Sequence, residues 1–290
     1  MCFNEGLSAQ SSSKRGSDLR KALPQMVRNY EVDRRHVLPA FRDAVTLAAL
    51  GLTVKKHRSQ LVRLGRSIRQ QAFEMRDELP SVKIVELSKF LGCNETKELV
   101  IPPLDVIVEG GLGYVELYAL LATVVSAIQP RKIMEVGTFR GVSSLTMALN
   151  APDAEIYTFD LPDEVEGTVA EGLTKGDQAC VEFSRGYKGA AFLGHPVESR
   201  IHFILADSLK MDVRDYMDSA DFCFIDGGHS YECIKADTEN AFKVLSPRGV
   251  ILWDDYSWYL EGVGQYLTEL AKTQPLWHIA GTNSVIYRRD

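Results

Sequence analysis

From Lys132 onward, short apolar runs that suit buried strands alternate with longer runs that suit helices. The expected strands are 132–136, 155–159, 201–205, 222–225 and 250–253, and the helices between and after them include 231–245 and 259–272. Two last strands, 277–280 and 284–287, flank Gly281 and predict a hairpin. This alternation predicts an α/β fold: a doubly wound, Rossmann-like, mostly parallel seven-stranded sheet with a C-terminal antiparallel hairpin.

The chain ahead of this sheet differs in character and predicts a separate organisation. Residues 1–19 are polar and Ser-rich, which is typical of a disordered tail. Residues 20–100 read as a helical N-terminal extension that includes a helical piece at 84–91, and an α/β domain is expected over 101–290. Within the extension an apolar stripe recurs at helical spacing: Leu38, Phe41, Val45, Ala48 and Leu52. A stripe this apolar must be covered, so we expect the extension to contact a second copy of the chain or the α/β domain.

The formal net charge of −6 is unevenly distributed along the 290 residues. Residues 1–70 hold 14 Lys and Arg against 5 Asp and Glu, so the extension is basic and the remainder is acidic. A basic segment of this kind fits a surface that docks on RNA or on a membrane. It fits equally a helix whose basic face is solvated or lies on the acidic domain. Aromatic residues do not alternate with basic ones as on a base-stacking surface, which argues against a nucleic-acid partner.

Location is predicted from the apolar segments and the cysteines. Arg42 and Asp43 interrupt the longest apolar stretch, 37–54, so no transmembrane segment is expected. The first 20 residues lack the apolar core of a signal peptide. Five scattered cysteines without a C-x-x-C pair predict neither a disulfide framework nor a zinc site. A cytoplasmic protein is the expectation.

A glycine turn follows the first predicted strand of the sheet. The segment Lys132–Gly141 reads as a strand, a turn at Gly137 and a helix that starts near Gly141. Such a turn presents backbone N–H groups to a ligand at the carboxyl end of a sheet. Phe139 stands where a dinucleotide fingerprint requires its second glycine, and no G-K-[ST] of a phosphate-binding loop is present. A turn that only connects a strand to a buried helix remains the alternative.

Acidic residues follow the other strands in the same way. Asp160, Asp207 and Asp226 each come after a predicted strand, and the pair Asp254 and Asp255 follows the fifth. Because parallel strands end at one edge of a sheet, these carboxylates are expected to line one site. One such carboxylate is often only a helix N-cap. Five in register favour a ligand site.

Two segments make a more specific resemblance. Phe224–Tyr231 reads Phe-Ile-Asp-Gly-Gly-His-Ser-Tyr, and Val250–Tyr256 reads Val-Ile-Leu-Trp-Asp-Asp-Tyr. Together with Glu135-x-Gly137-x-x-x-Gly141, they resemble bacterial class I S-adenosylmethionine-dependent methyltransferases, which are related to metal-dependent sugar O-methyltransferases of the macrolide type. The resemblance covers about 101–287 and says nothing about the first 100 residues.

The resemblance implies a cofactor site, a metal site and a catalytic pair. Asp160 would accept the ribose hydroxyls of S-adenosylmethionine, and Asp207 the adenine amino group. The full expected cofactor set is Glu135, Gly137, Thr138, Gly141, Ser143, Ser144, Asp160, Leu161, Asp207, Ser208 and Asp226. In the metal-dependent relatives the positions of Asp226, Asp254 and Asp255 hold Mg2+. Asp226 and His229 are the expected catalytic residues, with His229 as a general base or a further ligand.

Several alternatives stay open at this point. Asp226 could act without a metal while Asp254 and Asp255 cap the next helix, and His229 could be an ordinary loop histidine. The 161–200 segment between the second and third strands is long enough to be a lid or a substrate-binding element, in which Arg185, Tyr187 and Lys188 could contact a substrate. It could also be a surface excursion.

The expected function is O-methylation of a hydroxyl on a small molecule or sugar, in a biosynthetic enzyme that forms homo-oligomers through its N-terminal helices. Two other functions compete with it. One is a non-methylating S-adenosylmethionine-binding relative similar to cephalosporin hydroxylases. The other is an RNA- or membrane-docked binding protein that uses the basic N-terminal helices.

Overall fold

A computed structural model describes residues 82–92, 98–103, 105–107, 115–163, 172–257 and 260–290. The predicted tail over 1–19 and the predicted helices up to residue 81 lie outside the described residues. The described residues make up the α/β part of the chain and the short segment that leads into it.

Eight strands of the described chain form one sheet in the order β1-β7-β8-β6-β5-β2-β3-β4. Neighbouring strands from β6 through β4 are all parallel, and β8 runs antiparallel to both β6 and β7. The strand bounds are β1 Lys83–Val85, β2 Lys132–Val136, β3 Glu155–Asp160, β4 Ile201–Leu205, β5 Ala220–Ile225, β6 Leu245–Trp253, β7 Trp277–Ile279 and β8 Val285–Arg288. The predicted doubly wound sheet and its C-terminal hairpin are confirmed.

The eighth strand is the difference from the sequence prediction. The helix expected from Ile84 to Leu91 is wrong for its first two residues. Lys83–Val85 instead pairs in parallel with Trp277–Ile279, and the Ala280 N–H donates to the Val85 carbonyl at 2.9 Å. The helix α4 is limited to Leu87–Leu91. The unpaired edge of β7 offers the backbone hydrogen bonds that extend this short segment, and no local pattern in three residues announces such a partner.

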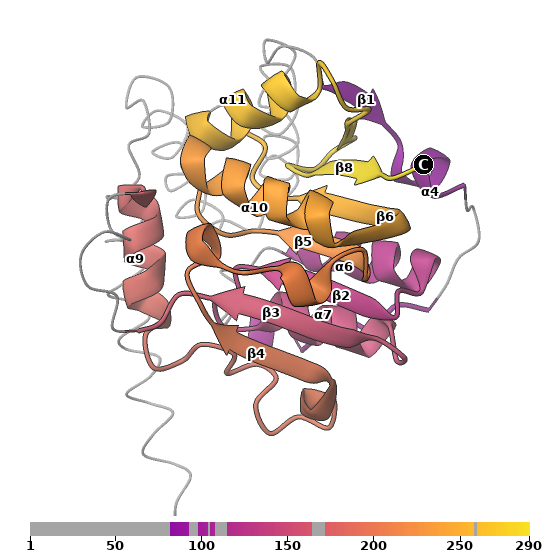
Figure 1. Cartoon of the computed structure of the whole chain (residues 1–290). Helices are drawn as coiled ribbons and strands as arrows, with labels where there is room; N and C mark the ends of the chain where they lie inside the picture. Colours follow the sequence, from indigo (N-terminus) through magenta and orange to yellow (C-terminus); the bar gives the residue numbers. More distant parts are fainter. Residues whose placement is uncertain (1–81, 93–97, 104, 108–114, 164–171, 258–259) are drawn as a thin grey trace, which may run out of the picture.

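Helices cover both faces of the sheet. In Figure 1, α10 (Tyr231–Val244) and α11 (Glu261–Leu270) lie together on one face, and α6 (Val115–Ile128) and α7 (Val142–Asn150) lie on the other. Side chains alternate between these layers along each strand. In β5, Phe222 and Phe224 join the α6–α7 core, whereas Cys223 and Ile225 join the α10–α11 core. Strands buried on both faces explain why the sequence shows continuous apolar runs there.

The segment between β3 and β4 contains an ordered helix, α9 (Lys175–Ser184), which lies beside the carboxyl ends of β3 and β4 (Figure 1). Thr174 caps it: its side chain accepts from the Asp177 N–H, and the Asp177 carboxylate accepts from the Thr174 N–H. This reciprocal capping box explains where the helix begins. Its position brings the segment to the edge of the sheet where a ligand site was predicted.

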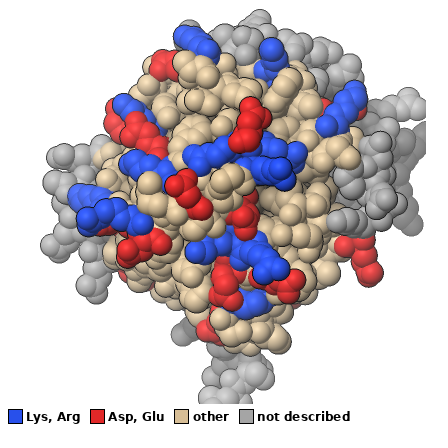
Figure 2. Space-filling view, turned by 45° about the vertical axis from the view of Figure 1, so that its right-hand side comes forward, with Lys and Arg blue, Asp and Glu red and all other residues tan. Residues whose placement is uncertain are grey.

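Charges of both signs are interspersed among the described residues on the face shown in Figure 2. Within the described part of the chain, none of the helices is long and apolar enough to cross a membrane.

Candidate active site

Packing and backbone conformation within the protein require the two glycines of the turn after β2, whether or not a ligand is bound. Gly137 has a φ of +100°, and a Cβ on it would overlap the Asp226 carbonyl oxygen. Gly141, at the N-cap of α7, has a φ of +82°, and a Cβ there would lie 2.5 Å from the ring of Phe192. Both positions therefore combine a backbone conformation that suits glycine with a close approach by another segment.

Glu135 is the most deeply buried carboxyl of this turn, with no exposed surface. The Ser144 hydroxyl donates to its Oε2, while Oε1 has no hydrogen-bond partner among the described residues. Burial raises the pKa of Glu135 to about 7, although hydrogen bonds from Ser143 and Ser144 act in the opposite direction. A buried oxygen without a donor is costly, so this atom is one that a bound ligand could satisfy.

Thr138 and Ser143 face the protein interior. The Thr138 hydroxyl lies 2.5 Å from that of Thr158, and both side chains are buried. Ser143 is also buried and lowers the pKa of Glu135 by hydrogen bonding to it. Of the predicted cofactor residues on this turn, these two thus fix the shape of the site through other side chains.

Asp160 organises the end of β3. Its Oδ2 accepts the Phe139 N–H at 2.6 Å, and its Oδ1 accepts the Leu161 N–H at 2.7 Å. The Lys188 ammonium lies 3.3 Å from Oδ1. Burial raises the pKa of Asp160 above its usual value, and the charge of Lys188 limits that rise. The carboxylate therefore joins the glycine turn, its own strand end and the segment after α9.

The end of β4 carries a second acidic position. Asp207 accepts the Leu209 N–H at 3.1 Å and pairs with Lys210 at 3.0 Å. The Ser208 carbonyl accepts from the Asn240 side chain at 3.1 Å, which ties this turn to α10. Asp237, also on α10, is 1% exposed, and neither of its oxygens has a partner among the described residues. Burial, together with the charge of Asp207, raises its pKa to about 7.

Acidic groups are concentrated at the ends of β5 and β6. Burial raises the pKa of Asp226 well above its usual value, and the nearby charges of Asp254 and Asp255 add to the rise. Burial and the charge of Asp255 likewise raise the pKa of Asp254 to about 7. The side-by-side strands therefore bring the three carboxylates together, as their positions in the sequence predicted.

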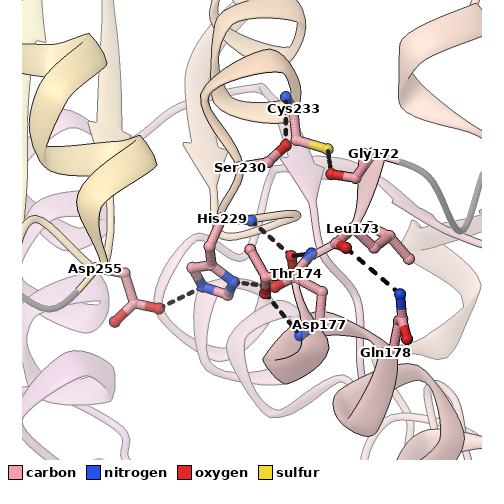
Figure 3. Close-up of polar contacts among 9 residues, drawn as sticks. All are labelled: Gly172, Leu173, Thr174, Asp177, Gln178, His229, Ser230, Cys233 and Asp255. Atoms are coloured by element: carbon pink, nitrogen blue, oxygen red, sulfur yellow. Dashed lines mark hydrogen bonds and ion pairs between the residues drawn. The ribbon is translucent and has the colours of Figure 1, made fainter. Parts of the chain in front are cut away.

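His229 lies between two carboxylates from different parts of the chain (Figure 3). Its Nδ1 contacts Asp177 of α9, and its Nε2 lies 2.6 Å from Asp255 Oδ2. The His229 backbone N–H also donates to Asp177 at 3.2 Å. Burial by itself lowers the pKa of His229, but the hydrogen bonds and charges of Asp177 and Asp255 outweigh it and raise the pKa well above 6.5. A carboxylate at each ring nitrogen fixes the orientation of the ring and favours its protonated form.

A candidate metal site includes this histidine. Ligand atoms of Asp226, His229 and Asp255 all lie within 4.8 Å of one another. Asp255 adopts a left-handed conformation with a φ of +60°, uncommon outside glycine and tolerated by Asp. Asp254 Oδ1 instead accepts from the Ser284 hydroxyl at 3.0 Å. Of the predicted metal ligands, Asp226 and Asp255 belong to this group and Asp254 does not. His229 is the third member of the group.

Three residues of the site have roles that the sequence does not predict. Asp177 carries no signal of its role, since the Thr-x-x-Asp capping pattern marks a helix start and does not reveal a histidine 52 residues away. Ser284 is predicted only as part of the hairpin. Lys188 is predicted near a substrate, but it is 7% exposed and paired with acidic residues; Tyr187 beside it is 46% exposed.

The central part of the chain is similar to a known protein family. Residues 134–256 match the family described as a methyltransferase domain. An uncharacterized protein, y4gI, of Sinorhizobium fredii is 32% identical over 164 residues, which is 52% of this chain and 16% of that protein. The chain therefore spans only a small part of the length of this curated relative.

Solved structures are similar to part of the chain at low sequence identity. One is SAH-bound methyltransferase PaMTH1 of Podospora anserina, with 17% identity, a TM-score of 0.45, and coverage of 61% of this chain and 79% of that one. Another is an O-methyltransferase of Bacillus cereus in complex with SAH, with 18% identity, a TM-score of 0.43, and coverage of 59% and 79%. Likenesses this distant carry no inference about ligands. The matched range, 134–256, includes the part of the sheet that bears the acidic site.

Proposed function

We propose that this chain is an S-adenosylmethionine-dependent O-methyltransferase whose acceptor is a hydroxyl of a small molecule or sugar, with assistance from Mg2+. The observation that supports the proposal is that residues 134–256, which match a methyltransferase-domain family, include Glu135 and Asp160 at the ends of β2 and β3 as well as the Asp226–His229–Asp255 group. The first pair suits a cofactor with an amino group and hydroxyls. The second group suits an acceptor hydroxyl and a cation.

The donors and acceptors present fit the cofactor. Glu135 Oε1 is buried and lacks a donor, so it can accept a hydrogen bond from a cofactor amino group. Asp160 and Asp207 are acceptors for ribose hydroxyls and for an adenine amino group. Five further residues shape the proposed cofactor site through packing and hydrogen bonds within the protein: Gly137, Gly141, Thr138, Ser143 and Ser144. S-adenosylmethionine supplies an electrophilic methyl group when bound.

The acidic group also fits a divalent cation. Two carboxylates and an imidazole are ligands that Mg2+ or Mn2+ accept, with oxygen donors preferred by Mg2+. Asp226 and Asp255 would hold the ion, with His229 beside them. Asp254, which accepts a hydrogen bond from the Ser284 hydroxyl, would orient this group. A bound cation lowers the pKa of an acceptor hydroxyl and positions it. It also relieves the repulsion among Asp226, Asp254 and Asp255.

The protein's own groups manage the acceptor proton. Asp177 and Asp255 contact the two ring nitrogens of His229 and so hold the ring in one orientation. Asp226, His229 and Asp255 interact strongly, and the proton of the acceptor hydroxyl passes to this group as a unit. Asp226 and His229 are the catalytic residues of the proposal.

Binding and turnover test the proposal separately. Calorimetry should show binding of S-adenosylhomocysteine, and the affinity should fall by about 1.5–3 kcal/mol in Asp160→Ala, the range for a hydrogen bond to a charged group. Transfer of labelled methyl from S-adenosylmethionine to a panel of hydroxylated sugars and phenols then tests the reaction. Absence of S-adenosylhomocysteine binding, or selective binding of NAD, would refute the proposal.

A further inference from the structure

Lys188 is a buried cation beside the proposed cofactor site. Its ammonium donates to the Leu161 carbonyl and lies 3.3 Å from Asp160 Oδ1 and 3.4 Å from Asp163 Oδ1. Three oxygens thus surround a group that has three N–H donors. A lysine is rarely buried to this degree unless its charge is paired, so these partners account for its position.

The residues after Lys188 run along the glycine turn. The Gly189 N–H donates to the Phe139 carbonyl at 3.0 Å, and the Ala191 N–H donates to the Arg140 carbonyl at 2.9 Å. Phe192 then fills the space that a side chain on Gly141 would occupy. We call residues 188–192 the strap. It fixes the outer side of the turn that leads into α7.

Phe139, which is hydrogen-bonded to the strap, has a strained backbone conformation. Its φ of +47° is uncommon for a bulky residue and costs about 1–2 kcal/mol. Its N–H is bound by Asp160 and its carbonyl by Gly189, so both peptide groups around it are fixed. Asp160 and the strap therefore hold this turn from two sides, and Lys188 joins Asp160 to the strap directly.

The orientation of the Asp160 carboxylate is set by these contacts. One oxygen accepts from the turn, and the other accepts from Leu161 and faces Lys188. Lys188 is the charged group that bears most on Asp160, and Glu135 of β2 interacts with it electrostatically; Asp163 shares Lys188 with Asp160. Lys188 is the one cation paired with it within 4 Å among the described residues. Without Lys188, the buried carboxylate would keep its two backbone hydrogen bonds but lack its counter-charge and the contact that holds Oδ1 from the strap.

We propose that Lys188 is a positioning residue for the cofactor's ribose: it holds the Asp160 carboxylate as the acceptor for the ribose hydroxyls. This role rests on the proposed function. It also assigns a role to the segment between β3 and β4, because a residue of that segment sets how tightly the ribose of the cofactor is bound. Lys188 itself acts through Asp160 and does not need to touch the cofactor.

The test compares two ligands in the full-length chain. S-adenosylhomocysteine and its 2′,3′-dideoxy analogue differ only in the hydroxyls that Asp160 would accept. The wild type should prefer the hydroxylated ligand by roughly tenfold to a hundredfold, the range for a hydrogen bond to a charged acceptor. In Lys188→Met this preference should fall to about threefold or less, because Asp160 loses its counter-charge and the contact that fixes its Oδ1 from the strap. A merely structural role of Lys188 would weaken both ligands equally and leave their ratio unchanged.

Two further variants keep the outcome decisive. Lys188→Gln retains a donor for the Leu161 carbonyl without the charge, and it replaces Lys188→Met if that variant does not fold by circular dichroism. Lys235→Met removes an exposed lysine of α10 that pairs with Glu239, and it should leave the preference unchanged. A wild-type preference that persists in folded Lys188 variants overturns the role of Lys188. A wild type that binds both ligands equally overturns the role of Asp160 and with it the inference. A wild type that binds neither overturns the proposed function itself.

Discussion

Replacing Glu135 with glutamine should change how the stability of the ligand-free protein depends on pH. The folded-state pKa of this carboxyl is about 7, against 4.5 for its ordinary value, because it is buried. Because the pKa is higher in the folded state, the folded protein is destabilised at every pH at which the carboxyl of the unfolded chain is ionised. The penalty is absent below pH 4.5, grows between pH 4.5 and 7, and is full above pH 7.

The size of the penalty is set by the shift. About 2.5 units at about 1.4 kcal/mol per unit give on the order of 3 kcal/mol at pH 8, and the same relation gives about 1 kcal/mol at pH 5. Glutamine keeps an oxygen for the Ser144 hydroxyl and cannot ionise. Its amide N–H2 faces the position that lacks a partner, which adds a cost of about 1–3 kcal/mol at every pH.

The measurement is urea unfolding of wild type and Glu135→Gln at pH 5 and pH 8. The absolute difference depends on the amide cost, but its change between the two pH values does not. The free energy of unfolding of the variant relative to wild type should rise by about 2 kcal/mol from pH 5 to pH 8. Glu182→Gln, on the exposed side of α9, is the matched control and should show no such change. Parallel pH curves for wild type and Glu135→Gln would refute the assignment of Glu135 as a buried carboxyl with a raised pKa.

Three further outcomes are expected of the site. Excess chelator, and the change Asp255→Ala, should abolish methyl transfer and leave S-adenosylhomocysteine binding within about threefold, measured by label transfer and calorimetry; full activity in chelator would exclude the cation. Asp177→Ala should lower kcat by about 10- to 100-fold because His229 loses its Nδ1 partner, whereas Thr174→Ala, which removes only the helix cap, should cost about 1 kcal/mol of stability; equal kcat in the two variants would contradict this. Gly137→Ala should lose about 3 kcal/mol or more in thermal unfolding, against about 1 kcal/mol for Gly186→Ala, whose Cβ would meet nothing within 4 Å; similar losses would show that the contact with Asp226 is not rigid.

The sequence predicts the sheet well because its central strands are buried on both faces. Val136 and Ile225 end runs that are mostly apolar because both faces of the strand are buried, and such runs can be recognised without knowing the neighbouring strands. The strand ends are then known, so the meeting of Asp226 with Asp254 and Asp255 could be predicted from parallel pairing alone. The short edge strand at Lys83 could not, because its stability comes from β7, nearly 200 residues later.

The candidate site was only partly predictable for a related physical reason. A sequence shows which side chains are acidic, basic or polar. It does not show which of them form hydrogen bonds with one another. Asp254 and Asp255 are adjacent and equally acidic, yet one is bound by Ser284 and the other reaches His229 from a left-handed backbone. No spacing rule distinguishes these two outcomes, since both depend on the local φ and on the hairpin that places Ser284.

The segment between β3 and β4 shows most clearly what the site requires. A lid that opened as one body over residues 172–192 would break the Asp177 contacts to His229 and the Lys188 contact to Asp160 together. The same motion would remove one partner from each of two carboxylates and an imidazole, and each such loss costs about 1–3 kcal/mol. Loosening this segment would therefore disturb the proposed cofactor acceptor and the catalytic histidine in one step. Because Asp177 and Lys188 lie eleven positions apart on one continuous segment, a substitution that weakens its packing should lower cofactor affinity and turnover in parallel, and a lid that only admits substrate would change turnover alone.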